Sequence, residues 1–391
     1  MTAPRRVYLV PGFFGFANLG ELRYFGHTRA FLARALADLG VEARVEAVPT
    51  PPTASLPRRA AFLLERLAAD DAAAPPPGAG AGGDGGAGTR IDLVGHSSGG
   101  LDARLLVSPD VSLPGAVAAA PFAARVGAIV TVATPHRGTP LASFFTSLLG
   151  QRLLQLLSLT TITALRVGHV PLAVLLKLGG LFARLDDLLL NSALLDQLFD
   201  QLLEDFSPER RAALDRFFAD VSADTSLLPQ LTPESMEVFN ASTRDRPGVR
   251  YGCVVTRGRR PGVGSTISAG LDPGAQATHA LYVALHGLAG GTPPERVAAV
   301  LRGPTGDALA AAYGGERVDC VDNDGVVPTL AQPWGELLQA VRGDHLDVIG
   351  HFNDPGHEPP HVDWIATGSG FDRAQFEAVW RAVARFLAQD G

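Results

Sequence analysis

Short apolar runs alternate with amphipathic stretches along most of this chain. Residues 7–10, 91–94 and 127–134 are apolar runs with the length of buried strands, and residues 41–48 alternate as in a half-buried strand. Residues 28–39 and 58–69 carry apolar side chains every three or four positions, as on one face of a helix. A further helix is predicted from Ser98 onward. This alternation predicts an α/β protein with a mostly parallel sheet flanked by helices.

Two apolar runs in the last third of the chain extend this pattern. Residues 318–321 end in a polar turn and are predicted to form a strand, and residues 339–341 form a second, shorter run. The only two cysteines, Cys253 and Cys320, lie in apolar, β-branched runs. We therefore expect both to be free thiols buried in strands rather than partners in a disulfide.

Length and composition are consistent with one large domain. With 391 residues, 46% of them hydrophobic, the chain can bury a large core, and we expect a single domain over residues 1–391. Residues 72–88 are nearly all Ala, Pro and Gly, which predicts a low-complexity linker outside the core. Residues 141–226 interrupt the alternation with a Leu- and Phe-rich stretch, which predicts a helical insertion.

The charge pattern argues against nucleic acid as a partner. The formal net charge is -7, and the sequence shows no basic stripe of the kind that a phosphate backbone requires. The first apolar run is too short for a secretion signal, so we expect a cytoplasmic location, with a mature form whose leader was removed as the alternative. Charged residues interrupt the apolar insertion before about 18 apolar residues accumulate, so no transmembrane segment is expected.

The stretch "GHSSG" from Gly95 to Gly99 is a candidate nucleophile site. It lies directly between an apolar strand and a helix, which is the setting of a G-x-S-x-G nucleophile elbow. Small residues must lie two positions before and two positions after the nucleophile, because strand and helix approach closely there. Gly95 and Gly99 meet this need for Ser97, whereas His96 would have to meet it for Ser98. Ser97 is therefore the predicted nucleophile, and Ser98 contributes its backbone N–H.

A serine nucleophile needs a histidine base and a carboxylate that orients the histidine. In proteins with a nucleophile elbow, the Asp or Glu follows the serine in the sequence, and the His follows the carboxylate. Three aspartates compete at the turn after residues 318–321, namely Asp319, Asp322 and Asp324. His345, 21 residues after Asp324, lies in the next loop and is the favoured base. The remaining later histidines are expected in a helical stretch (His279 and His286) or at the surface of a proline-rich tail (His351, His357 and His361).

Four segments together resemble the bacterial true lipases, the triacylglycerol lipase branch of the α/β-hydrolase superfamily. They are "LVGHSSGG", "TVATPHRGT", "DNDGVV" and "DHLDVI", and the resemblance covers roughly residues 7–141 and 227–349. It implies an α/β-hydrolase fold in which Asp324 is the acid of the catalytic triad and His345 the base. It also implies an oxyanion hole formed by the backbone N–H groups of Phe13 and Ser98, although Pro11 stands where the family has histidine.

The same resemblance bears on metal binding. Secreted members of the family bind calcium through two aspartates near the base, and Asp347 occupies the position of one of them. Asp307 is the nearest candidate for the other, at a spacing that does not match the family. A structural calcium ion is thus one expectation, and Asp347 as a solvated carboxylate is the other. No other cofactor is expected.

The resemblance implies a carboxylic ester hydrolase, a lipase or esterase, that forms an acyl-enzyme. Medium or long acyl esters are the expected substrates. The apolar insertion is expected to form a helical lid over the acyl site that contacts a lipid surface transiently, with an ordinary structural subdomain as the alternative. The same triad would serve a phospholipase, thioesterase, polyester depolymerase or acyltransferase. A lipid-binding or partner-binding protein without catalysis is the alternative from another class.

Overall fold

The computed structural model describes residues 5–13, 24–73, 89–167, 173–177, 197–198, 200–202, 208, 211–212, 224–270 and 272–389. Most of the predicted linker, residues 74–88, lies outside this part of the chain, as do residues 178–196 of the predicted insertion. Among the helices that are described, none is long and apolar enough to cross a membrane.

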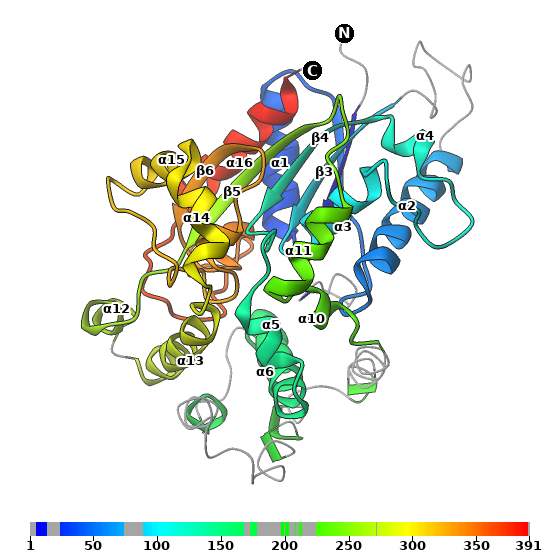
Figure 1. Ribbon diagram of the computed structural model, residues 1–391. Coiled ribbons are helices and arrows are strands. Elements are labelled where there is room, and N and C mark those ends of the chain that lie inside the picture. The colour runs from blue at the N-terminus through cyan, green and yellow to red at the C-terminus, as the bar shows by residue number, and fades with distance from the viewer. Residues whose placement is uncertain are drawn as a thin grey trace.

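A single parallel sheet of six strands organises the described structure (Figure 1). Its order is β2-β1-β3-β4-β5-β6. The strands are β1 (Arg5–Val10), β2 (Ala43–Ala47), β3 (Arg90–His96), β4 (Val126–Val132), β5 (Arg250–Arg257) and β6 (Glu336–Arg342). The chain first moves outward from β1 to β2 and then returns past β1 to β3, so the order reverses beside β1. The loops after β1 and β3 therefore separate at a topological switch point, where open α/β sheets form their sites.

Helices cover both faces of this sheet, as the sequence pattern predicts. Alternate side chains of β1 point to opposite faces, because side chains along a strand alternate. Val7 and Leu9 pack in one core with α1 (Gly26–Asp38) and α16 (Arg373–Ala388). Tyr8 and Val10 pack in another with α2 (Leu56–Ala72) and α3 (Ser98–Val107).

The remaining elements cover the far edge and the carboxyl end of the sheet (Figure 1). The helices α14 (Pro294–Arg302) and α15 (Pro304–Ala312) lie near β5 and β6, and α13 (Pro273–Ala289) contacts α5 (Pro140–Phe145). Both α5 and α6 (Leu148–Val167) lie below β4. The other described helices are α4 (Ala120–Ala123), α10 (Leu227–Gln230), α11 (Pro233–Ser242), α12 (Val263–Ser268), η2 (Thr329–Ala331) and η3 (Asp347–Ile349).

Two sequence predictions are wrong in the last third of the chain. Residues 318–321 form no strand, because β6 occupies the position beside β5, and only Val318 of the two valines is buried while Val321 is 41% exposed. Cys320 therefore lies half-buried in a turn, whereas Cys253 is buried in β5 as predicted. Both cysteines are free thiols.

The prediction of surface histidines in the tail is also wrong for two residues. His351 and His361 are buried, because the tail folds back over α1 instead of extending into solvent. His351 donates to the backbone carbonyl of Tyr24 at 3.1 Å, and the ring of His361 stacks on His27 of α1. His279 and His286 lie on α13, as expected for the helical stretch.

Candidate active site

Ser97 forms the tip of a sharp turn between β3 and α3. Its backbone has φ 55° and ψ -133°, a conformation that residues other than glycine rarely adopt. The turn needs its flanking glycines, because a Cβ on Gly95 would overlap the backbone of Gly99 and Gly100. A Cβ on Gly99 would overlap the carbonyl oxygen of Val10 in β1. The structure therefore has a sharp strand-to-helix turn at Ser97, with the close approach at Gly95 and Gly99 that a nucleophile elbow requires.

The loop after β1 lies directly against Ser97. A Cβ on Gly12 would lie 2.9 Å from Ser97 Oγ, so only glycine lets the backbone pass this close to the hydroxyl. Phe13 follows Gly12 at the edge of the described loop and packs against buried apolar residues of the core. Ser98 begins α3, where backbone N–H groups have no partner within the helix. Both predicted oxyanion donors therefore belong to segments that adjoin Ser97.

Asp324 and His345 are joined by a hydrogen bond, although 21 residues separate them in the sequence. His345 Nδ1 donates to Asp324 Oδ2 at 2.9 Å, and both side chains are buried. The carboxylate also accepts hydrogen bonds from the backbone N–H groups of Val326 and Val327 and from the side chains of Thr256 and Gln332. These donors fix the carboxylate, which in turn holds the ring with its proton on Nδ1 and leaves Nε2 as a base.

The competing aspartates have other partners. Asp322 is buried and forms ion pairs with Arg257 at 3.0 Å and with Arg260. Asp319 is exposed and lies 3.7 Å from Arg260. Of the three aspartates in this turn, Asp324 is the one that contacts His345.

A chain of hydrogen bonds through His96 links the three loops of the site. His96 Nε2 lies 2.8 Å from the carbonyl oxygen of His345, which can only accept, so the ring carries its proton on Nε2. His96 Nδ1 then accepts from the hydroxyl of Tyr24 at 2.6 Å, and the same hydroxyl accepts from the N–H of Gly12 at 3.3 Å. Burial and the nearby His345 hold the pKa of His96 well below its ordinary value, which keeps the ring neutral. No sequence signal predicts this link, because Tyr24 and His96 meet only in the fold.

A buried arginine fixes the start of the loop after β1. Arg59 of α2 donates to the carbonyl oxygen of Pro11 at 2.7 Å and forms a bidentate ion pair with Asp102 of α3. Burial raises the pKa of Asp102 to about 6, and the guanidinium opposes that shift. Arg59 therefore ties α2, α3 and the loop together beneath Ser97, again by contacts that sequence spacing does not reveal.

Two buried carboxyl groups, those of Asp344 and Asp347, and the half-buried one of Asp363 form a cluster at the loop of His345. One oxygen each of Asp344, Asp347 and Asp363 lies within 4.8 Å of the others. Asp344 Oδ1 accepts three hydrogen bonds, whereas Asp344 Oδ2 has no partner among the described residues. Burial raises the pKa of Asp344 to about 7, and burial together with the charge of Asp344 raises the pKa values of Asp347 and Asp363 well above the ordinary range.

This cluster contains one of the two aspartates named from the sequence. Asp347 is buried in it, and its Oδ2 accepts a hydrogen bond from the backbone N–H of Asp344 at 2.8 Å. Asp307 lies exposed in the first turn of α15 and is not part of it. The cluster offers oxygen atoms alone, which are the ligands that calcium prefers.

The described part of the insertion packs against the same core as the sheet. Phe145 of α5 and Leu153, Leu156 and Leu157 of α6 are buried in the cluster that contains β1 and α1. In the helical segment 173–177, Leu175 is 6% exposed whereas Leu176 is 56% exposed. The insertion therefore has a buried apolar side and at least one exposed apolar side chain.

Comparisons with solved structures show which fold this is. Lipase 1 from Pelosinus fermentans is 16% identical, with a TM-score of 0.53 over 100% of both chains. EstA from Clostridium botulinum is 18% identical, with a TM-score of 0.51 over 98% of this chain and 87% of that one. No protein-family model and no curated protein matches the chain. The predicted α/β-hydrolase fold, with its parallel sheet flanked by helices, is confirmed.

Proposed function

We propose that this protein is a carboxylic ester hydrolase whose triad is Ser97, His345 and Asp324. The observation that carries the proposal is the strained Ser97 turn packed against Gly12, with the hydrogen-bonded pair of His345 and Asp324 in the adjoining loops. The link from His96 to the carbonyl of His345 supports it, since His96 directly precedes the nucleophile. The fold shared with a lipase and with EstA agrees with this chemistry.

The reaction proceeds through an acyl-enzyme. Ser97 Oγ attacks the acyl carbonyl while His345 Nε2 takes the hydroxyl proton, and Asp324 stabilises the resulting imidazolium. The backbone N–H groups of Phe13 and Ser98 donate to the oxyanion, and each such donor is typically worth about 3 kcal/mol in the transition state. The intermediate collapses, and His345 returns the proton to the departing alcohol. Water then attacks the acyl-enzyme by the same steps and releases the acid and free Ser97.

The apolar insertion supports esters of medium or long acyl chains as the substrates. The apolar α5 and α6 follow β4 at the carboxyl end of the sheet, where the nucleophile also lies. Exposed apolar side chains such as Leu176 would meet a lipid surface when the insertion moves. In this proposal the insertion is a lid over the acyl site.

The carboxylate cluster fits a calcium ion beside the base. Asp344, Asp347 and Asp363 supply oxygen ligands. Asp344 Oδ2 is buried without a hydrogen-bond partner among the described residues, so it has a lone pair available for a metal ion. When bound, the ion would offset two of the three negative charges that the ionised carboxylates carry. Its role is structural, since Asp344 and Asp347 flank His345 and Leu346 in the sequence.

A fluorophosphonate probe tests the proposed hydrolase directly. Such a probe reacts covalently with an activated serine, and we expect one modification per chain, located on the peptide that contains Ser97. The Ser97→Ala variant should remain unlabelled while keeping the circular dichroism spectrum of the wild type. Wild-type protein that is folded and takes up no label would contradict the proposal and favour a binding protein with a hydrolase fold.

A further inference from the structure

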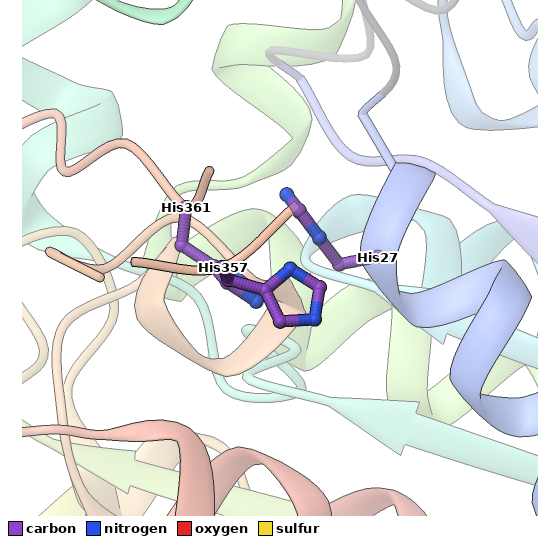
Figure 2. Close-up of side chains that lie close together, drawn as sticks. All are labelled: His27, His357 and His361. Carbon is purple, nitrogen blue, oxygen red and sulfur yellow. The ribbon is translucent and has the colours of Figure 1, made fainter. Parts of the chain in front are cut away.

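Three histidines from distant parts of the chain converge away from the triad. His27 is the second residue of α1, and His357 and His361 lie in the loop after η3 (Figure 2). One ring nitrogen of each lies within 4.8 Å of one ring nitrogen of the others. Figure 2 shows His27 approaching from its helix while the other two approach from the loop.

Each ring of this histidine cluster is hydrogen-bonded to a backbone carbonyl. His361 Nδ1 donates to Gly350 at 2.7 Å, and His357 Nδ1 donates to Pro359 at 2.7 Å. His27 donates to the carbonyl of Pro360. A carbonyl only accepts, so each of these nitrogens carries the proton and the other nitrogen of a neutral ring keeps its lone pair. Metal-binding histidines show this arrangement, in which a backbone oxygen fixes the tautomer.

The surroundings keep two of the rings neutral and oriented. Burial, followed by the neighbouring His361, His351 and His357, lowers the pKa of His27 to about 4. Burial also lowers the pKa of His361, whose ring lies between His27 at 3.7 Å and Phe352 at 4.2 Å between centroids. Ring stacking and the hydrogen bond to Gly350 therefore hold His361 in a fixed orientation beside His27.

The two loop histidines have the sequence spacing of a zinc-peptidase motif but not its helical structure. The segment "HEPPH" matches the H-E-x-x-H pattern, which places both rings on one face when it is helical. Here the segment is not helical, as two prolines within it require, and Glu358 is exposed. The third histidine comes from α1 instead of from the same element. The three histidines therefore join α1 to the loop after η3. The exposed Glu358 is not positioned as the general base of a peptidase.

We propose that His27, His357 and His361 bind one divalent transition-metal ion of the zinc class. Three imidazole nitrogens select such ions over calcium and magnesium, which prefer oxygen. A tetrahedral zinc site places ligand nitrogens about 3.3 Å apart, with water in the fourth position. The nitrogens are within 4.8 Å, so the rings must draw together by about 1.5 Å or less, and the stack of His27 on His361 must tilt.

The ion would join the two loops that carry the site. His27 follows Tyr24, whose hydroxyl holds Gly12, and His357 and His361 follow the loop of His345. Two metal-free contacts already hold these segments together: Thr28 Oγ1 donates to the carbonyl of Ile349 at 2.8 Å, and His351 donates to that of Tyr24. The ligands are therefore positioned before the metal binds. Because 330 residues separate His27 from His357, the metal would close a very long loop and stabilise the folded chain.

Metal titration of the full-length chain tests this site. Protein stripped with EDTA and dialysed should bind one Zn²⁺ per chain in isothermal titration calorimetry, in the presence of excess calcium. Co²⁺ in its place should give the visible absorption of a tetrahedral site. The melting temperature should rise by roughly 2–5 °C at saturating Zn²⁺. Because His357 is only half-buried, the His357→Ala variant should keep its fold. It should bind Zn²⁺ at least about tenfold more weakly than the wild type.

Two matched variants separate this site from other metal-binding groups. His286→Ala removes a histidine of α13 that packs on Tyr282, and it should bind Zn²⁺ like the wild type. Asp347→Asn alters the carboxylate cluster and should also keep the Zn²⁺ affinity. Folded wild-type protein without stoichiometric binding would overturn the proposal, as would unchanged affinity in both His357→Ala and His361→Ala.

Discussion

The backbone of Ser97 is the clearest mark of function at the level of single residues. A serine with φ 55° is strained by about 1–3 kcal/mol, and the surrounding structure must sustain that cost. The close approach of Gly12 and the glycines at positions 95 and 99 hold the turn in place. The strain exposes one hydroxyl to the loop after β1, which a relaxed turn would not do.

Substitution of the two adjacent serines should separate their roles. Ser97→Ala removes the nucleophile, and we expect ester hydrolysis to fall by at least about 10³-fold. Ser98→Ala should keep activity within about threefold, because its Oγ is buried without a partner in the described structure and its backbone N–H is retained. Rates on a soluble p-nitrophenyl ester measure both. Equal losses in the two variants would contradict the assignment.

The two aspartates of the acid turn should differ in the same way. Asp324→Asn lets His345 adopt the wrong tautomer, and kcat should fall by about 10⁴-fold with little change in KM. Asp322→Asn breaks the ion pairs with Arg257 and Arg260, so it should lower the melting temperature and retain most of kcat. Kinetics and thermal melts of both variants provide the check. A larger kcat loss in Asp322→Asn would move the acid to that residue.

Those parts of the proposed site that are local in the chain can be located from the sequence. Ser97 and its glycines are recognisable because a strand end and small residues mark them, whereas the turn of Asp324 follows residues 318–321, which are predicted to form a strand but do not. Tyr24, His96 and Arg59 were missed, because their contacts link Gly12, His345 and Pro11 across the fold. Such contacts have no sequence period, so they become visible only when the elements pack.

At the level of elements, close packing of α3 on β1 explains the glycine-rich turn. Gly99 of α3 meets the carbonyl of Val10, the last residue of β1. Central parallel strands read as apolar runs because both of their faces are buried, which is why β1, β3 and β4 were predictable. Residues 318–321 have the same kind of run, but a neighbouring strand takes the place beside β5. Which of two segments pairs with β5 depends on both segments and cannot be predicted from the sequence of either one alone.

Two Gly→Ala substitutions should have opposite effects on stability. Gly99→Ala places a methyl group in the carbonyl oxygen of Val10, and we expect a loss of several kcal/mol or no folded protein. Gly287→Ala lies within α13 with nothing within 4 Å of the new Cβ, so it should stabilise by about 0.5–1 kcal/mol. Urea denaturation measures both. A neutral Gly99→Ala would show that the turn is looser than the structure indicates.

The carboxylate cluster on the base loop predicts a pH effect with a definite sign. Raised pKa values mean that folded Asp344, Asp347 and Asp363 bind more protons than the unfolded chain. Their contribution to stability is therefore greatest at low pH. It falls as the pH rises from about 4, the unfolded value, through about 7 for Asp344 and beyond. Without metal, wild-type stability should decline over this window more than that of Asp347→Asn.

Calcium should oppose this decline, because it binds the deprotonated carboxylates. Thermal melts at pH 5 and pH 8, with EDTA and with millimolar calcium, provide the measurement. The histidines, which titrate with the opposite sign, are present in both proteins and cancel in the difference. A calcium effect that persists in Asp347→Asn would place the ion elsewhere.

At the scale of the whole molecule, sheet order determines which distant residues meet. Its reversal beside β1 brings Gly12 to Ser97, and β6 leads into the loop of His345. The C-terminal tail then folds onto α1, which buries His351 and His361. A pattern-based prediction placed these histidines at the surface because the tail is rich in proline and has no helical period. Tertiary packing decided otherwise.

The insertion offers two neighbouring leucines that separate a lid from a structural subdomain. If it is a lid, the exposed Leu176 contacts lipid, and Leu176→Ser should lower the rate on long-chain emulsions several-fold while acetate esters and the melting temperature are unaffected. Leu175→Ser opens the buried side, so it should lower stability and both activities together. Wild-type turnover of long-chain substrate should also rise sharply once its solubility limit is crossed. Parallel losses in both variants, with saturation kinetics that show no break at that limit, would contradict the lid and leave the triad untouched.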